Sequence, residues 1–396
     1  MAVRTASFVP ADEPFFREWS ARQPGERRSL ARAAAYATGL GLDVAAVPAP
    51  LVVVGSKGKG TTATYASARL AASGVRVGTV TSPGYRTNRE RIRVNGEAIP
   101  ASDYEALSHR VAAALLAVAA PEGGYLSPTG LFTLAGVWWL MAAGCEALVL
   151  EAGIGGGSDE VSLFTPATVA ITRIFDEHLG ILGDSVTEIA REKAAVVRPG
   201  TRSVLTIPQC AEVAAALPPA TIVDSVPDGL ALPAGLSGLN AALGVQAAEA
   251  HGATGGDIGG DIARVLATVT LPGRLSVHRR GDQSFLVDSA IDPVGVRAAL
   301  DWRGAGLSSV VVAFPDGKRP AACLAELAGC RVVPVCTENR RLTFADPVWD
   351  PFRPLPVFAD LDLPKLGPRV LALGTISFVG EVLDRLDVPT ERTFQV

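Results

Sequence analysis

One glycine-rich stretch holds the residues best suited to chemistry: Gly55, Ser56, Lys57, Gly58, Lys59, Gly60, Thr61 and Thr62. It directly follows four apolar, mostly β-branched residues, Leu51-Val-Val-Val, which predict a buried parallel strand. Glycines let backbone N–H groups approach an anion, Lys59 adds a positive charge, and a following helix adds the positive end of its dipole. The Thr61 hydroxyl could hold Mg²⁺ beside phosphates. The stretch therefore predicts a phosphate cradle for a nucleotide, called the cradle below.

The cradle departs from the usual phosphate-binding loop, G-x-x-x-x-G-K-[ST]. Gly60 stands between Lys59 and Thr61, and the glycines lie closer together than in that pattern. The plainer alternative is a glycine-rich turn from a strand into a helix. Because a strand, a lysine, hydroxyls and a helix pattern occur together here, nucleotide binding is the better interpretation.

The composition predicts a folded protein with more than one core. Of the 396 residues, 48% are hydrophobic and 19% are charged, which argues against disorder, and the length favours two or three domains. The net charge is −4, and the Arg279-Arg280 and Arg340-Arg341 pairs are short, so we expect solvated faces and no nucleic-acid partner.

Other features predict a cytoplasmic protein, which we expect to be a monomer or a small homo-oligomer. The five cysteines are odd in number and lack C-x-x-C spacing, so we expect reduced packing residues. The N-terminus has no sustained apolar run and so no signal peptide. The uncharged stretch 126–145 has the length of a membrane span, but Pro128, Thr129 and Gly130 interrupt it. We therefore expect a buried helix at 131–143 and no membrane partner.

Strand and helix patterns alternate along the first part of the chain. A helical region at 12–48 precedes the cradle, and Asn95-Gly96 between alternating apolar residues predicts a hairpin at 92–99. Ser102 or Asp103 is expected to cap a helix that reaches about residue 119. Further strands are expected at 75–80, 147–150 and 168–172, and further helices at 62–73, 186–197 and near Asn240.

The strand ends indicate where a ligand would bind. Ligands of open α/β sheets gather at the carboxyl ends of the strands. Glu151 follows the strand expected at 147–150, and Asp176-Glu177-His178 follows the strand expected at 168–172. We therefore expect Glu151 to lie near the cradle.

A glycine-rich segment between His251 and Asp261 predicts a flexible connection. Strands expected near 285–287, 310–314, 332–336 and 370–373 then alternate with helices. We predict two domains: residues 1–272, with a helical lead-in and the nucleotide site, and residues 273–396, a smaller α/β domain.

Motifs in a fixed order resemble the folylpolyglutamate synthase and dihydrofolate synthase branch of the Mur ligases, from about residue 15 to the C-terminus. Besides the cradle they are Thr81-Ser82-Pro83, the segments 90–97 and 151–156 with Asp159, 182–184, 189–194, Pro199-Gly200, Pro272-Gly-Arg274 and 288–293. The resemblance implies a Mur-ligase-like α/β fold. It has a P-loop ATPase-type central domain with a parallel-rich sheet and a smaller Rossmann-like C-terminal domain.

The activity that the resemblance implies is ATP-dependent amide ligation. A carboxylate would take the γ-phosphoryl group of ATP to give an acyl phosphate, which an amine or amino acid would attack, with release of ADP and phosphate. The partners would be these small molecules, with ATP and Mg²⁺ as cofactors.

Site residues follow from motif position. The resemblance implies that Thr61, Ser82, Glu151 and His178 are metal ligands. Lys59, Glu151, His178 and Lys193 would be catalytic, and Asn240, Arg274 and Asp288 would contact the nucleotide. Lys193 matches a lysine that is carbamylated in this family, which requires a neutral amine that burial can provide.

Each assignment has a plainer alternative. His178 could be a surface or capping histidine, Glu151 could cap a helix, and Lys193 could be a salt-bridge partner in a charge-rich helix.

Departures from the family pattern lie on the substrate side. Gly84 and Ile291 replace histidines, Arg89 replaces an asparagine, and the arginine of the Gly-Gly-Arg-Leu-Asp segment is lost before Asp159. The His-Gln pair upstream of Asn240 is replaced by Leu236-Ser237. The family has a Thr-x-Phe-Glu stretch, but the matching region 129–133 contains no glutamate. Isoleucine can neither hydrogen-bond nor carry charge, so we expect a non-folate carboxylate in a specialised pathway. The alternatives are a true folylpolyglutamate or dihydrofolate synthase that adds glutamate, and a non-catalytic nucleotide-binding homologue.

Overall fold

The computed structural model describes residues 10–396 except 24, 119–123, 231, 234, 256–257, 304–305 and 340. By their contacts the described residues form two units. The larger unit contains residues 10–84, Arg89–Val269 and Glu391–Val396, and the smaller contains Tyr85–Asn88 and Thr270–Thr390. The predicted division into residues 1–272 and 273–396 stays a proposal.

An eight-stranded sheet forms the centre of the larger unit, in the order β4-β3-β2-β5-β1-β6-β7-β8. All neighbouring pairs are parallel except β2 with β3 and β3 with β4. The strands are β1 (Leu51–Val54), β2 (Val77–Val80), β3 (Ile92–Val94), β4 (Glu97–Ala98), β5 (Ala147–Glu151), β6 (Thr168–Ile171), β7 (Ser203–Thr206) and β8 (Thr221–Ile222).

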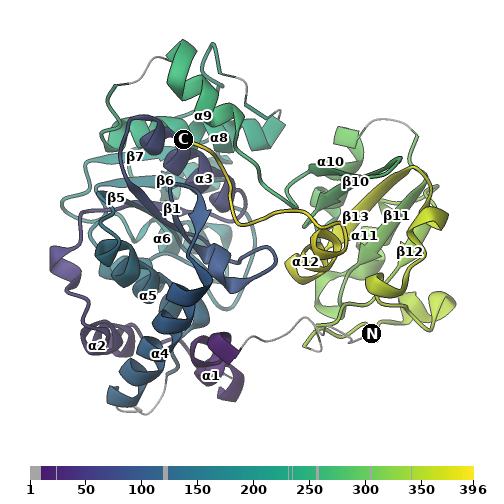
Figure 1. The fold of residues 1–396 in the computed structure, drawn as a ribbon, viewed down its shortest axis with the longest axis horizontal. Helices are drawn as coiled ribbons and strands as arrows, with labels where there is room; N and C mark the ends of the chain where they lie inside the picture. Colours follow the sequence, from purple (N-terminus) through teal and green to yellow (C-terminus); the bar gives the residue numbers. More distant parts are fainter. Residues whose placement is uncertain are drawn as a thin grey trace. The chain divides into compact units, whose positions relative to one another are not determined.

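Helices cover both faces of this sheet, so that its strands are apolar on both sides (Figure 1). Leu51 and Val53 of β1 pack with α3 and α8, whereas Val52 and Val54 pack with α2, α4 and α5. The helices are η1 (Pro10–Asp12), α1 (Glu13–Ala21), α2 (Leu30–Leu40), η2 (Val44–Ala46), α3 (Lys59–Ala72), η3 (Asn88–Arg91), α4 (Ala101–Ala117), α5 (Pro128–Ala142), η4 (Glu160–Leu163), α6 (Val186–Ala194), α7 (Ala211–Ala216), α8 (Gly235–His251), η5 (Ile258–Ile262) and α9 (Ala263–Ala267).

The predicted hairpin is confirmed. β3 and β4 pair antiparallel around Asn95 and Gly96, whose φ angles are +46° and +81°. A two-residue turn of this kind needs positive φ at both positions, which Asn-Gly adopts more readily than other pairs.

Several predicted helix limits are wrong. α3 begins at Lys59, three residues before the expected start, because Gly60 is tolerated in the first turn. α5 begins at Pro128: the Ser127 side chain accepts a hydrogen bond from the Gly130 N–H, and proline needs no N–H donor at the first position. α4 is preceded by Pro100 and has no side-chain cap, and α6 ends at Ala194. The predicted flexible connection lies partly outside the described residues, and from Ile258 it forms η5.

The smaller unit is built on a five-stranded sheet in the order β12-β11-β13-β10-β9, in which only β9 is antiparallel. Its strands are β9 (Ser276–Arg280), β10 (Gln283–Asp288), β11 (Ser309–Ala313), β12 (Val332–Pro334) and β13 (Arg369–Gly374). Its helices are α10 (Pro293–Arg303), η6 (Asp316–Lys318), α11 (Pro320–Ala325), η7 (Pro347–Phe352), η8 (Phe358–Asp360), η9 (Leu363–Leu366) and α12 (Ile376–Arg385). The packing of α12 on one face and of α10 and α11 on the other gives the Rossmann-like layering.

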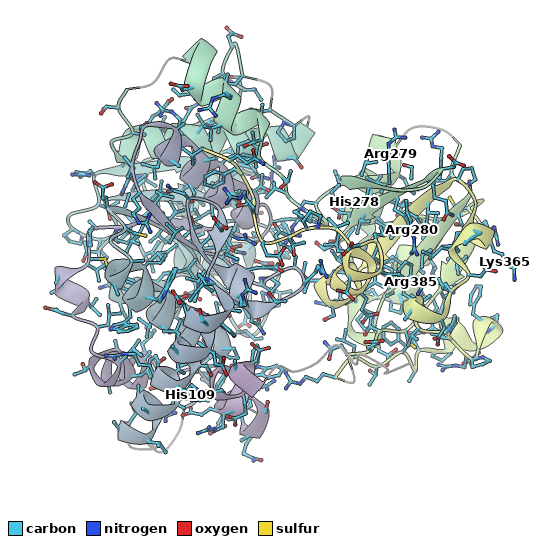
Figure 2. The ribbon with its side chains drawn as sticks, in the orientation of Figure 1. His109, His278, Arg279, Arg280, Lys365 and Arg385 are labelled. Carbon is cyan, nitrogen blue, oxygen red and sulfur yellow. The ribbon has the colours of Figure 1, made fainter. Side chains whose placement is uncertain are left out.

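Surface features bear on three further expectations. All five cysteines are free, but Cys210 is exposed and so is not a packing residue. In the described part of the chain, no helix is long and apolar enough to cross a membrane. Arg279 and Arg280 lie exposed on β9 (Figure 2), and Arg340 lies outside the described residues.

Candidate active site

The cradle connects the carboxyl end of β1 to α3, and two of its glycines leave no room for a side chain. Gly55 has φ +136°, and a Cβ atom there would lie 2.0 Å from Thr172 Oγ1. Gly58 has φ +97°, and a Cβ atom there would lie 2.2 Å from Asn240 Nδ2. The backbone at both positions therefore requires glycine.

The start of α3 offers N–H groups to an anion. Gly58 is the N-cap residue, and no side chain caps the helix. The first N–H groups of a helix lack intrahelical partners and carry the positive end of the helix dipole. Lys59 Nζ donates to the Gly55 carbonyl at 3.0 Å, which places its charge over the cradle. This arrangement fits bound phosphates.

Ser56 and Lys57 tie the cradle to the end of β6. The backbone N–H of Ser56 donates to the Arg173 carbonyl at 2.9 Å, and that of Lys57 donates to the same oxygen at 3.4 Å. The Phe175 N–H donates to Ser56 Oγ at 3.3 Å. These contacts hold the cradle against the neighbouring strand.

Asn240, on α8, lies directly beneath Gly58. Its carbonyl oxygen accepts a hydrogen bond from Thr62 Oγ1 at 2.9 Å, so Thr62 joins α3 to α8. The side-chain Oδ1 of Asn240 is buried and has no hydrogen-bond partner among the described residues. A buried amide oxygen without a partner is costly.

Lys193 reaches the cradle from α6. Its Nζ donates to the Gly55 carbonyl at 2.9 Å and forms an ion pair with Glu177 Oε1 at 2.8 Å. Burial lowers the pKa of Lys193, and the charge of Lys59 lowers it further, whereas Glu177 acts in the opposite direction. Lys193 is therefore a salt-bridge partner of Glu177 in this structure, as the plainer alternative predicted.

Glu151 and Ser82 lie together at the carboxyl ends of β5 and β2. The Ser82 N–H donates to Glu151 Oε2 at 2.9 Å, and a Cβ atom on Gly60 would lie 3.7 Å from the same oxygen. Glu151 is therefore beside the first turn of α3, as expected. The hydroxyl of Ser82 accepts a hydrogen bond of 2.7 Å from Arg91 Nη1.

Arg91, which contacts the Ser82 hydroxyl, is a residue that the motif analysis did not single out. Its guanidinium lies 4.6 Å from the centre of the Phe132 ring, and burial lowers its pKa to about 10. The contacts with Phe132 and Ser82 together fix the orientation of the Arg91 guanidinium. Its place inside the Glu90-Arg91-Ile92 motif was the available signal.

Under the prediction that Ser82 is a metal ligand, replacing Arg91 with lysine is expected to weaken Mg²⁺-dependent nucleotide binding about 10- to 100-fold, because residues that orient metal ligands have effects of that size. The lysine keeps the charge but loses the planar contact with Phe132. Titration of ADP with and without Mg²⁺ measures the effect. If the variant lost the same amount of ADP affinity with and without Mg²⁺, Arg91 would not act through Ser82.

The predicted metal ligands are only partly brought together. Thr61 is buried in the first turn of α3, and Glu151 is adjacent to that turn. His178 is exposed, has φ +51°, and its carbonyl accepts hydrogen bonds from the Ile181 and Leu182 N–H groups at 3.0 and 3.1 Å. Among the described residues no group of three or more histidine, cysteine or acidic side chains is placed to hold a metal.

Arg274 and Asp288 belong to the smaller unit and contact its own residues. Asp288 Oδ2 accepts a hydrogen bond from the Leu275 N–H at 2.8 Å, and the Arg274 guanidinium donates to Ser289 Oγ. Both side chains therefore stabilise the turn between α9 and β9 and the end of β10.

A buried charge network supports the glycine loop after Glu151. The carboxylate of Asp159 accepts hydrogen bonds from the Gly153 and Ile154 N–H groups at 3.0 and 3.2 Å. Arg28 contacts Asp159 Oδ2 at 3.1 Å and Glu160 Oε2 at 3.4 Å. Although the arginine of the Gly-Gly-Arg-Leu-Asp segment is lost, Arg28 therefore brings a guanidinium to Asp159 from a distant part of the chain.

Glu160 makes the stability of this network depend on pH. Burial, and then the neighbouring Asp159, raise the pKa of Glu160 to about 7, against the opposing effect of Arg28. A carboxyl group whose pKa is raised by folding stabilises the folded state below its unfolded pKa of about 4.5, and this stability is lost as the pH rises to about 7.

Glu160→Gln is therefore expected to flatten the dependence of the unfolding midpoint on pH between about 4.5 and 7, because glutamine cannot ionise. Chemical unfolding at several pH values measures this. Glu146→Gln, at an exposed position outside the network, is the matched control. An unchanged slope in Glu160→Gln would show that Glu160 is ionised throughout.

The sequence of this chain is similar to those of several known proteins. The sequence is 44% identical over 146 residues to the probable bifunctional folylpolyglutamate synthase/dihydropteroate synthase of Haloferax volcanii, which covers 36% of this chain and 17% of that protein. It is 32% identical over 158 residues to the dihydrofolate synthase/folylpolyglutamate synthase of Bacillus subtilis, covering 40% and 37%. The chain is a relative of the folylpolyglutamate and dihydrofolate synthases. The resemblance drawn from the motifs is thus confirmed.

The solved structures agree on the fold. The apo folylpolyglutamate synthase of L. casei superposes with a TM-score of 0.76 at 21% identity, over 95% of this chain and 99% of that one. The Thermotoga maritima folylpolyglutamate synthase gives 0.79 at 19% identity, over 96% and 97%. The predicted Mur-ligase-like α/β fold is confirmed. No protein-family profile matches the chain, and the matches span well under two thirds of these curated relatives' length.

Proposed function

We propose that this protein is an ATP-dependent ligase that joins a carboxylate to the amino group of an amino acid. The observation that carries the proposal is the cradle at the carboxyl end of β1. There Lys59 and the uncapped start of α3 lie together. The names of the relatives support ligation, and one similar solved structure, 21% identical, is a complex of folylpolyglutamate synthase with AMPPCP and folate.

In this reaction the protein's main contribution is to stabilise charge, and no covalent intermediate with the protein is needed. A carboxylate oxygen attacks the γ-phosphorus, the bond to the β-phosphate oxygen breaks, and ADP leaves. The amine then attacks the acyl carbon and loses a proton, and phosphate leaves. In this proposal Lys59, which contacts Gly55, and the N–H groups at the start of α3 would stabilise the negative charge that moves toward ADP.

Mg²⁺ is proposed as the metal, with Glu151, Ser82 and Thr61 as oxygen ligands and His178 as a further ligand. The adjacency of Glu151 to Ser82 and to the first turn of α3 supports the oxygen set, since Mg²⁺ prefers oxygen. When bound, the metal would neutralise phosphate charge. His178 is the weakest member, because its side chain is exposed.

Carbamylation of Lys193 also stays a proposal. The amine now donates to Gly55 and Glu177, whereas a carbamate would carry a negative charge and would repel Glu177. Mass spectrometry of the intact protein in bicarbonate, with Lys193→Arg as the comparison, tests for one added CO₂.

For the substrate, the comparisons favour the folate alternative over the non-folate carboxylate expected from the departures. The relatives are named for dihydrofolate and folylpolyglutamate synthesis. We therefore propose glutamate addition to a reduced folate or to dihydropteroate as the first candidate.

A non-folate carboxylate is the second candidate, and two contacts support it. Ile291 packs against the apolar core of the smaller unit, and Arg89 Nε donates to the Ile99 carbonyl at 3.0 Å. These side chains serve the protein's own structure at positions where the family has polar residues.

The deciding experiment incubates the purified protein with ATP and Mg²⁺, glutamate, and either tetrahydrofolate or dihydropteroate. ADP release that depends on both substrates, with a product heavier by one glutamyl residue, is the expected result. If ADP forms only with other acids or amines, the second candidate holds. If no acid and amine pair releases ADP, the ligase proposal fails and a non-catalytic nucleotide binder is indicated.

A further inference from the structure

The larger unit contains a pocket that is separate from the cradle. Its volume is about 780 Å³, within the range of small-molecule sites. It is lined by the beginnings of β7 and β8, the loop after β8 and the last turns of α8. β7 is parallel to β6, which is parallel to β1, so the pocket lies toward the amino ends of these strands. The cradle is at their carboxyl ends.

Polar groups in the pocket wall are available to a ligand. The wall includes the Arg202 guanidinium, the hydroxyls of Ser203 and Thr221 and the amide of Gln246. None of these side chains makes a hydrogen bond or an ion pair with another residue of the part of the chain that the structure describes. The Arg202 guanidinium can donate hydrogen bonds to an anionic group, and the hydroxyl and amide groups can hydrogen-bond the uncharged part of a ligand.

The charge balance at the pocket is positive. Glu249, the acidic residue of the wall, forms an ion pair with Arg69 at 3.3 Å, which offsets its charge. The charge of Arg202 has no such partner among the described residues, and it contributes, after burial, to lowering the pKa of the nearby His251. A ligand with a negative group is therefore favoured over a cation.

The rest of the wall is apolar. Val204, Leu205, Pro219 and Pro227 contribute surfaces against which a flat or aliphatic body can pack. The combination of one guanidinium, neutral hydrogen-bonding groups and apolar surfaces selects a small organic anion rather than an inorganic ion.

We propose that this pocket binds a small organic anion, bearing a phosphate or a carboxylate, as a ligand additional to any nucleotide in the cradle. Arg202 holds the anionic group, and Gln246, Ser203 and Thr221 hydrogen-bond the body. The proposal does not depend on the ligase activity. α8 links the two places, since Asn240 lies under Gly58 and Gln246 lies about 9 Å further along the same helix.

The test uses the whole chain saturated with ADP, so that the cradle is occupied. AMP is the phosphate-bearing probe and N-(4-aminobenzoyl)-glutamate is the carboxylate-bearing probe, each titrated by calorimetry. We expect at least one probe to bind, and the one that binds identifies the anionic group. Lys59→Met, in the cradle, should leave this binding unchanged.

Two variants locate the site. Arg202→Glu reverses the charge, and Ala250→Trp fills the pocket from its wall; both positions are exposed, so folding should be preserved. Each is expected to weaken binding at least about tenfold. Arg198→Glu, an exposed residue outside the lining, is the matched charge control and should bind as the wild type does. Absence of binding by both probes, or binding unaffected by both pocket variants, would overturn the proposal.

Discussion

Lys59→Met is expected to lower kcat/KM for ATP-dependent turnover by at least about 100-fold, since loss of one well-placed group that stabilises developing charge has effects of that order. The Lys59 ammonium is placed over the cradle by its 3.0 Å contact with the Gly55 carbonyl. That contact is a single hydrogen bond of a half-buried side chain, so the thermal unfolding temperature should change little.

Lys365→Met is the matched control for this prediction. Lys365 lies exposed on the smaller unit, in a surface ion pair with Asp362 (Figure 2). Such pairs contribute little to stability, and turnover should stay at the wild-type level. If Lys59→Met kept more than a tenth of the wild-type kcat/KM, the cradle would not be the site of phosphoryl transfer.

Gly58→Ala is expected to have the second large effect, on both stability and nucleotide affinity. Alanine at φ +97° is strained, and its Cβ would lie 2.2 Å from Asn240 Nδ2. Strain and overpacking together should lower the free energy of unfolding by about 2–4 kcal/mol. Because relief of the clash must move the start of α3 or α8, ADP affinity should fall at least about tenfold. Chemical unfolding and calorimetric titration measure the two effects.

Gly74→Ala separates strain from the clash. Gly74 has φ +81°, but a Cβ atom there would have no neighbour within 4 Å among the described residues, so alanine adds the strain alone, about 1 kcal/mol. Its nucleotide affinity should equal that of the wild type. In the double variant Gly58→Ala, Asn240→Ala, removal of the amide should restore part of the lost stability. Equal losses in Gly58→Ala and Gly74→Ala would mean that the contact with Asn240 is unimportant.

Local sequence patterns were sufficient for much of the fold. The apolar run 51–54 and the glycines after it specify β1, the turn and α3, because buried parallel strands and tight turns have short-range signatures. Asn95-Gly96 specifies the hairpin for the same reason. The helix starts were harder: a proline that reads as an interruption at 128 is a favourable first residue once Ser127 caps the helix.

Residues of the candidate site were found by their order in the chain, but their partners were not. The sequence placed Glu151 at a strand end near the cradle, and it lies there beside Ser82. It did not indicate that Arg91 would hold the Ser82 hydroxyl or that Arg28 would reach Asp159, 131 residues away. The pocket at the start of β7 also left no motif.

Only the tertiary structure decided which groups surround the cradle. Lys193 contacts Gly55 across 138 residues of sequence, and Asn240 contacts Thr62 across 178. These contacts exist because β6 and β7 follow β1 in the sheet while α8 returns to pack along α3. Strand order and helix packing depend on the burial of whole apolar faces, which no short stretch encodes. The ability to bind an anion at 55–62 is therefore local, whereas the environment that tunes it is a property of the folded unit.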